Sequence, residues 1–140
     1  KNNIKITDKR MTRFNIGLDQ GVEFVLFCLI HSIGGEIFVP KLQSYNILNL
    51  AKAISPNSKY KTIGIREGEK LHEEMITKSD SLNTLENKKF YIILPSNMDI
   101  AKFKKKFKAN KVSKMFSYNS LENKQRLNIS QIRKLISKNI

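Results

Sequence analysis

The sequence predicts an α/β fold that belongs to a larger domain. Helical patterns alternate with short apolar strands along the chain, as is typical of this class. A helix is predicted at about residues 20–32, and Gly34-Gly35 ends it before an apolar strand at 36–39. A strand reading Ile-Phe-Val is normally buried within a sheet, and this one has no evident partner strand. We therefore expect its partners to lie upstream of the first residue.

The elements before this strand are predicted from alternation and capping. Residues 4–16 alternate loosely between apolar and polar types, which favours an extended segment. Asp19 is the expected N-cap of the helix at 20–32, and Glu23 lies near the positive end of the helix dipole. From Phe24 to Ile30 the helix is apolar nearly all round, which indicates burial on more than one side.

The second half of the chain predicts further short elements from its periodicity. In order, these are a helix at 46–54, a strand at 60–65, a short helix at 69–76 and a strand at 90–94. Ser130 is the expected N-cap of a last helix. That helix carries Ile132, Leu135 and Ile136 on one face.

Positive charge is concentrated near the end of the chain. The formal net charge is +14, and residues 99–140 hold 12 Lys and Arg against 2 Asp and Glu. Such a tail can attract nucleic acid or an anionic membrane surface. On nucleic acid, Lys102 to Lys108 would bind phosphates while Phe103 and Phe107 stack on bases. The other interpretation is a solvated face in a chain rich in Lys and Asn. Because no recognised nucleic-acid-binding motif is present, we expect no nucleic-acid partner.

The single cysteine and the apolar runs bear on location. Cys28 lies in an apolar stretch, where a lone cysteine usually serves as a small hydrophobe, and it has no partner for an internal disulfide. No apolar run approaches the roughly 20 residues that cross a bilayer. We expect a cytoplasmic protein without a membrane span.

Two stretches carry arginines suited to binding an anion. In the run DKRMTRF, alternation places Arg13 on the side of Met11 and opposite Thr12. In the run IGIREGEKLHEE, a strand delivers Arg66 to a glycine-containing turn ahead of a predicted helix. Arginine can hold phosphate oxygens with a planar fork of donors. The alternative for both residues is a solvated surface arginine.

Other kinds of site find little support in the sequence. His72-Glu73 resembles the start of the zinc motif H-E-x-x-H, but Ile76 stands where the second histidine is required. Neither common phosphate-binding glycine loop is present. We expect structural roles for His31 and His72. Glu73 and Glu74 are expected to face solvent in two directions on a helix, and we expect no metal site and no catalytic residue.

Three motifs, in this order and spacing, resemble one family: MTRFNI with LDQGVEFVL, then GGEIFVPK, then IGIREGEKLHEEMI. They resemble the inverting UDP-N-acetylglucosamine 4,6-dehydratases, also called polysaccharide-biosynthesis dehydratases, of the extended short-chain dehydrogenase/reductase superfamily. The resemblance is strong from about Ile4 to Glu86, loose over 95–117, and returns at Tyr118–Leu127. It implies that this chain is the C-terminal part of such an enzyme.

The resemblance implies three parts in this chain. Residues 1–40 would be the last elements of the Rossmann domain, 41–94 the small substrate-binding lobe, and 95–140 a basic tail with a C-terminal helix. The NADP-binding half and the catalytic residues would lie upstream. This chain alone would then bind no cofactor and have no activity, and an inactive truncated remnant is a further alternative.

The family's reaction and substrate contacts follow from the same resemblance. The parent enzyme, expected to be a homo-oligomer, would use NADP to oxidise C4 of UDP-N-acetylglucosamine, eliminate water across C5–C6 and return hydride to C6 with inversion at C5. The products would serve surface polysaccharide or glycan biosynthesis. Arg13 and Arg66 match arginines that meet the UDP portion. Glu69 matches a carboxylate suited to sugar or ribose hydroxyls, and Thr7 and Asn123 match weaker substrate contacts.

Three residues depart from the family's usual wording. Glu67 and Gln43 each stand where a proline is common, and Asn119 stands where a serine is common. Glu67 also places a negative charge beside the expected diphosphate site. These departures bear on substrate affinity more than on the fold.

Overall fold

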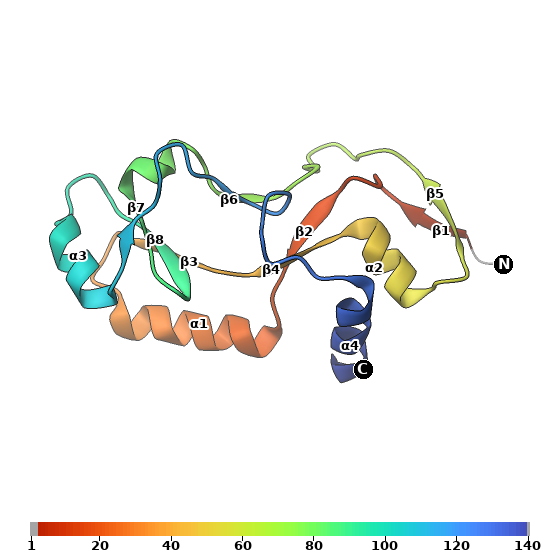
Figure 1. Ribbon diagram of the computed structural model, residues 1–140, viewed down its shortest axis with the longest axis horizontal. Helices are drawn as coiled ribbons and strands as arrows, with labels where there is room; N and C mark the ends of the chain where they lie inside the picture. Colours follow the sequence, from red (N-terminus) through yellow and green to blue (C-terminus); the bar gives the residue numbers. More distant parts are fainter. Residues whose placement is uncertain (1–2, 140) are drawn as a thin grey trace. The chain divides into compact units, whose positions relative to one another are not determined.

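The computed structural model describes residues 3–139, which form two compact units (Figure 1). The first unit takes in the residues up to Asn15, Gln43–Glu73 and the residues from Asn119 onward, and the second takes in Ile16–Leu42 and Glu74–Tyr118. In chain order the elements are β1 (Asn3–Ile6), β2 (Thr12–Asn15), α1 (Leu18–His31), β3 (Ile37–Pro40), β4 (Gln43–Asn46), α2 (Ile47–Ile54), β5 (Lys59–Thr62), β6 (Glu74–Ile76), the 3-10 helix η1 (Asp80–Asn83), β7 (Thr84–Glu86), β8 (Phe90–Ile93), α3 (Ile100–Phe107), β9 (Asn110–Lys111), β10 (Tyr118–Asn119) and α4 (Ile129–Asn139).

Each unit is discontinuous in sequence, because the chain leaves the first unit after Asn15 and returns to it twice. The division into residues 1–40, 41–94 and 95–140 concerns roles in a parent enzyme. It stays a prediction, since the compact units are defined by contacts and not by role.

The first unit contains two strand pairs. β1 runs parallel to β5, and β2 runs antiparallel to β4. A third segment lies beside β4: the Ser44 N–H donates to the Gln125 carbonyl over 2.9 Å, and the Leu127 N–H donates to the Ser44 carbonyl over 2.8 Å. The extended segment predicted at 4–16 is thus two strands with a turn between them.

Side-chain caps set the starts of the two helices in this unit. Asn46 Oδ1 accepts the Leu48 N–H over 2.8 Å at the start of α2. Asn128 Oδ1 accepts the Gln131 N–H over 2.9 Å and the Ser130 hydroxyl over 2.7 Å at the start of α4. The prediction that Ser130 is the N-cap is therefore wrong. Ser130 lies in the first turn of α4, because the side-chain oxygen of Asn128 already accepts the backbone N–H that an N-cap residue binds.

The core of the first unit lies between α2 and α4, which are in contact. Ala53 and Leu127 are buried there together with Ile132. Leu135 and Ile136 pack against this cluster, which confirms the predicted apolar face of the last helix.

The second unit contains a four-stranded antiparallel sheet in the order β3-β8-β7-β9. Ile37 lies opposite Ile93, and Pro40 lies opposite Phe90. The strand predicted at 90–94 is confirmed as β8. The expectation that the strand at 36–39 has no partner within the chain is wrong, because β8 pairs along its whole length. That partner follows far along the sequence, so local patterns gave no sign of it.

Phenylalanine rings fill the core of the second unit. Phe27 and Phe90 have ring centroids 5.1 Å apart, and Phe107 meets Phe38 edge-on at 5.4 Å. Phe103, at the centre of α3, is only 2% exposed. The two rings that a nucleic-acid-binding tail would stack on bases are thus packed in a protein core.

The start of α1 differs from the prediction by two residues. Gly17 is the N-cap, and its N–H donates to Gln20 Oε1 over 3.2 Å. The expected cap, Asp19, lies in the first helical turn, where its charge still suits the helix dipole. The predicted cap is therefore wrong, while the helix itself is confirmed.

One face of α1 is apolar and exposed. Phe24 and Phe27 pack against the aromatic core, but Leu18, Leu29 and Ile30 are 84%, 73% and 76% exposed. Within residues 3–139, nothing supplies the burial on more than one side that the sequence led us to expect.

The short helix predicted at 69–76 is absent. Gly68, just before it, adopts φ +79°, and the last residues of the predicted helix form the strand β6 instead. Between Gly68 and β6, the Thr12 N–H of β2 donates to the Leu71 carbonyl over 3.1 Å. The Leu71 carbonyl is therefore bonded to a neighbouring strand and not within a helix. Residues 71–73 lie along β2 before β6 begins.

Candidate functional site

The loop that carries Arg66 starts where β5 ends. The pairing of β5 with β1 continues past the strands, because the Gly64 N–H donates to the Thr7 carbonyl over 3.1 Å. Gly64 and Gly68 have φ values of +91° and +79°, which favour glycine. The structure therefore brings the candidate residue Thr7 beside the start of this loop.

Arg66 and Glu69 close the loop on each other. The Arg66 N–H donates to Glu69 Oε2 over 3.0 Å, and the Glu69 N–H donates to the Arg66 carbonyl over 3.1 Å. The Arg66 side chain is exposed, and within residues 3–139 its guanidinium has no hydrogen bond or ion pair. The structure has no helix starting at Glu69, so no helix dipole adds to anion binding at this loop. Among the described residues, the guanidinium of Arg66 is thus an unpaired positive charge on a turn that two hydrogen bonds with Glu69 close.

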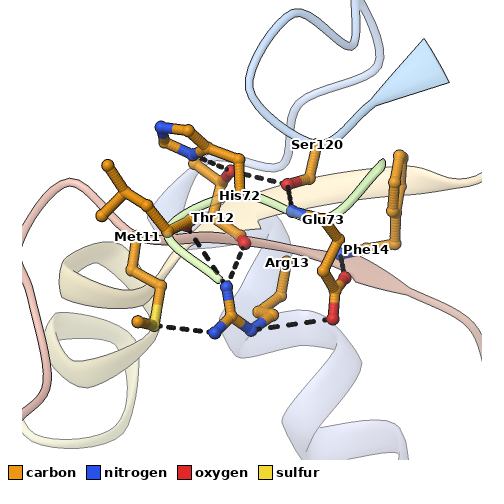
Figure 2. Close-up of polar contacts among 8 residues, drawn as sticks. Met11, Thr12, Arg13, Phe14, His72, Glu73 and Ser120 are labelled. Atoms are coloured by element: carbon orange, nitrogen blue, oxygen red, sulfur yellow. Dashed lines mark hydrogen bonds and ion pairs between the residues drawn. The ribbon is translucent and has the colours of Figure 1, made fainter. Parts of the chain in front are cut away.

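Arg13 lies on β2 and is held by the protein itself (Figure 2). Its Nη1 donates to the carbonyls of Thr12 (2.7 Å) and Leu71 (3.3 Å), and its Nη2 donates to the Met11 sulfur over 2.9 Å. Its Nε lies 3.6 Å from Glu73 Oε1, and the side chain is 20% exposed. The predicted placement of Arg13 on the side of Met11 is confirmed. An Nη group carries two N–H bonds, so Nη2 retains one for a ligand.

Asn123 lies on the segment that leads to residues 125–127. Its Oδ1 accepts the Gln125 N–H and its Nδ2 donates to the Gln125 carbonyl, both over 3.3 Å. The same Gln125 carbonyl accepts from Ser44 of β4. Asn123 belongs to the first unit with the other four candidate residues, and its bonds with Gln125 shape its own segment.

A polar network next to Arg13 was missed by the sequence analysis (Figure 2). The Thr12 hydroxyl hydrogen-bonds His72 Nδ1 at 2.8 Å and the Ser120 hydroxyl at 2.7 Å. Ser120 Oγ accepts the Glu73 N–H over 2.9 Å, and Glu73 Oε2 accepts the Phe14 N–H over 2.9 Å. The only sign of this in the sequence was the alternation that turned Thr12 away from Arg13.

Glu73 was expected to be a solvated residue on a helix, and that prediction is wrong. Its carboxylate binds the β2 backbone and faces Arg13, while its own backbone pairs with Ser120. The error follows from the absent helix, because an extended segment points this side chain at the neighbouring strand. Glu74 is exposed, as expected.

The charges around His72 are mostly positive. Burial lowers the pKa of His72 below its usual value, and the positive charges of Arg126, Arg10 and Arg13 lower it further, while Asp8 raises it. The hydrogen bonds from Arg10 lower the pKa of Asp8 to about 2. Arg126 is therefore a further positive charge near His72, in addition to Arg10 and Arg13.

The described residues do not fit a dinucleotide cofactor. A dinucleotide cradle needs a glycine-rich turn between a parallel strand and a helix. The parallel pair of β1 and β5 does not provide such a turn, because the chain leaves β1 toward β2 and not toward a helix.

Among residues 3–139, no group of three His, Cys, Asp or Glu side chains is placed to hold a metal ion. Likewise, no helix within this part of the chain is long and apolar enough to cross a bilayer.

Comparison with known proteins extends the sequence resemblance. The chain is 48% identical over 128 residues to the UDP-N-acetylglucosamine 4,6-dehydratase (inverting) of Campylobacter jejuni subsp. jejuni serotype O:23/36 (strain 81-176). It is 54% identical over 93 residues to the protein of the same name from serotype O:2 of that species. The aligned parts are 87% and 66% of this chain but only 38% and 28% of those proteins.

A solved structure and a relative with a different name also match nearly all of this chain but less than half of their own length. The X-ray structure of Pen from Bacillus thuringiensis matches with a TM-score of 0.79 and 25% identity, over 98% of this chain and 40% of that one. UDP-glucose 4-epimerase from Rickettsia akari is 30% identical over 137 residues, which are 95% of this chain and 40% of that protein. The expected α/β class is confirmed, and the chain spans less than half the length of each of these proteins.

The family is shown by the extent of its match. Residues 1–95, more than half of the chain, match the family described as "Polysaccharide biosynthesis protein". This confirms the resemblance carried by the three motifs, and the chain belongs to the polysaccharide-biosynthesis protein family.

Proposed function

We propose that this chain is the UDP-sugar-binding part of an inverting UDP-N-acetylglucosamine 4,6-dehydratase that makes precursors of surface polysaccharides or glycans. The observation that supports this most is the guanidinium of Arg66, which has no partner among the described residues and lies on a closed turn within a motif of this family. The Gly64 N–H, near the start of the same loop, bonds the Thr7 carbonyl. Two relatives that are 48% and 54% identical bear the dehydratase's name.

The diphosphate of UDP offers several anionic oxygens, which suit a planar guanidinium. In the proposed site, Arg66 supplies the main contact, because no protein group within residues 3–139 competes for its donors. Arg13 supplies positive charge and the remaining Nη2 N–H, and its carbonyl partners fix its orientation. Two arginines from different segments would then clamp one ligand.

Three further residues complete the proposed site. Glu69 uses Oε2 to close the turn, so Oε1 can accept a ribose or sugar hydroxyl. Thr7 and Asn123 are assigned weaker polar contacts with the substrate. The negative charge of Glu67, next to Arg66 on an exposed turn, would weaken diphosphate binding.

The chemistry itself is assigned to the remainder of the parent enzyme. NADP, bound there, would accept and return hydride, and residues of that part would move the protons. The groups of this chain would bind and orient the UDP-sugar. Assembly as a homo-oligomer and location in the cytoplasm are parts of the same proposal.

A titration of UDP and UDP-N-acetylglucosamine against the chain tests the site. Arg66→Ala removes a charge-assisted contact of about 1.5–3 kcal/mol, so binding should weaken roughly 10- to 150-fold. Arg66→Lys should restore only part of the loss, since lysine has no fork. Lys138→Ala, which removes the same charge from an exposed position of α4, is the matched control. If Arg66→Ala and Arg66→Lys both bind like wild type, the site assignment fails.

A turnover assay tests the division of labour. The chain supplied with NADP and UDP-N-acetylglucosamine should show no dehydration, and measurable turnover would contradict the proposal. Tight binding of mixed oligonucleotides that weakens steeply with salt would instead support the nucleic-acid alternative.

A further inference from the structure

Two buried hydroxyls link the protein backbone to His72. Ser120 and Thr12 are 0% and 1% exposed, and their oxygens lie 2.7 Å apart. Ser120 Oγ accepts the Glu73 N–H over 2.9 Å, and Thr12 Oγ1 lies 2.8 Å from His72 Nδ1 (Figure 2). Each hydroxyl has one proton to give, so the direction of this chain can be worked out.

The buried position of Ser120 sets that direction. Its oxygen already accepts from Glu73, so its proton needs an acceptor, and a buried hydroxyl without one costs free energy. Thr12 Oγ1 is the acceptor within reach. Thr12 must then donate its own proton onward to Nδ1 of His72. In the reverse direction, the proton of Ser120 would be left buried and unpaired.

This direction fixes the state of the imidazole. An Nδ1 that accepts a hydrogen bond carries no proton, so the ring is neutral and its proton sits on Nε2. Figure 2 shows the second ring nitrogen pointing away from the labelled network. The residue is half-buried, and within residues 3–139 Nε2 has no hydrogen-bond partner. The same low pKa that burial and Arg126, Arg10 and Arg13 give His72 agrees with a neutral ring.

We propose that His72 is held as the Nε2–H tautomer by the Ser120–Thr12 hydroxyl chain and donates this N–H to a phosphate oxygen of the bound nucleotide. The ligand half of this inference rests on the proposed function. His72 would be a binding residue, while Ser120 and Thr12 would be positioning residues that act through it.

The Nε2–H of a neutral His72 would make ligand binding directional at a site whose other donors are arginines. The neighbouring arginines attract any anion from a distance, whereas the His72 N–H rewards an oxygen only where the ring points. Because the hydroxyl chain is buried, the donor is set before the ligand arrives, and no proton has to move upon binding.

The tautomer is tested by ring-nitrogen NMR on the full chain, which contains only two histidines. His72 should show a protonated Nε2 and an unprotonated, hydrogen-bonded Nδ1. Thr12→Val and Ser120→Ala should change these signals, while His31 serves as the internal reference. Thr12→Ser keeps the hydroxyl and should retain the wild-type pattern, which also covers a failure of Thr12→Val to fold.

Ser44→Ala is the matched control. Ser44 is as buried as Ser120 and lies in the same unit, but its hydroxyl has no hydrogen-bond partner among the described residues. This variant should leave the His72 signals unchanged. A protonated Nδ1 in the wild type, or an unchanged His72 spectrum in Ser120→Ala, would overturn the proposed tautomer.

A titration with UDP and with pyrophosphate tests the ligand half. Both should perturb the His72 Nε2 signal, and His72→Ala should weaken UDP binding about 2- to 10-fold, the range of a neutral hydrogen bond. His72→Gln, which can present an N–H at a similar distance, should recover part of this loss. UDP that binds without perturbing His72 would overturn the donor role alone. No UDP binding by the wild type would overturn the proposed function together with that role, while the NMR spectrum still judges the tautomer.

Discussion

The two compact units are stabilised by different kinds of interior. The second unit buries stacked and edge-on phenylalanines around a four-stranded sheet. The first unit has a small aliphatic cluster between two helices, and its buried hydroxyls of Thr12 and Ser120 bond to each other although they are 108 residues apart. The buried serine and threonine hydroxyls of the second unit, those of Ser81 and Thr84, bond to backbone carbonyls three or four residues away. Burial of apolar groups stabilises a fold in many packing geometries, whereas a hydrogen bond stabilises it only within a narrow range of distance and angle. The unit whose buried serine and threonine hydroxyls bond over a long distance in sequence is the one that contains every candidate binding residue.

The largest effect is expected in the aromatic interior. Phe103→Ala should lower the free energy of unfolding of the second unit by about 3–5 kcal/mol, because it removes buried area and leaves a cavity. Hydrogen exchange read by mass spectrometry would locate the loss. Protection should fall in Ile16–Leu42 and Glu74–Tyr118 and change little in Gln43–Glu73. Equal loss of protection in both units would show that they do not respond separately.

A smaller effect should separate two equally buried serines of the first unit. Ser120→Ala removes a hydroxyl with satisfied hydrogen bonds and should cost about 1–3 kcal/mol. Ser44→Ala removes a hydroxyl without a partner among the described residues and should be neutral or stabilising. Urea denaturation of both variants gives the comparison. Similar costs for the two would argue against the network as a source of stability.

His72 should make the first unit sensitive to acid. Its folded-state pKa lies below the usual 6.5 because of burial and nearby arginines, so the unfolded chain binds this proton more readily. The free energy of unfolding should therefore fall as the pH drops below about 6.5. His72→Gln should remove this part of the pH dependence, whereas His31→Gln should not. Asp8, with a pKa of about 2, titrates below this range.

The smallest effect on stability is expected on the exposed face of α1. Replacing Leu29 and Ile30 by lysine should change the free energy of unfolding by no more than about 0.5 kcal/mol per site, because both side chains are mostly exposed. The same change should reduce self-association, since exposed apolar faces drive it. Sedimentation analysis of the wild type and the double variant measures this. A wild type that is monomeric at all concentrations would contradict the expectation.

Much of the fold could be predicted because its signals are local. The helix at 46–54 was visible from apolar residues one turn apart, and Asn46 caps it from the adjacent position. The apolar run of β8 and the apolar face of α4 were equally legible. The loop around Arg66 was also foreseen, because its glycines stand within four residues of each other in the sequence.

The candidate site could be predicted only in part, because many of its contacts join residues that are far apart in the sequence. Sequence motifs pointed to Arg13, Arg66 and Glu69, but not to the groups that hold Arg13 or to the hydroxyls beside it. The bond between Thr12 and His72 joins residues 60 positions apart, and that between Thr12 and Ser120 joins residues 108 apart. Periodicity describes neighbours on one element, so it carries no information about such pairs.

The sequence by itself determined the family, the order of most elements and an exposed arginine on a glycine turn. Tertiary structure decided that β3 pairs with β8, that residues 71–73 lie along β2, and that Glu73 faces Arg13. The physical reason is the same in each case. A backbone or carboxylate group takes the partner that folding brings within hydrogen-bond reach, and that partner can come from any part of the chain.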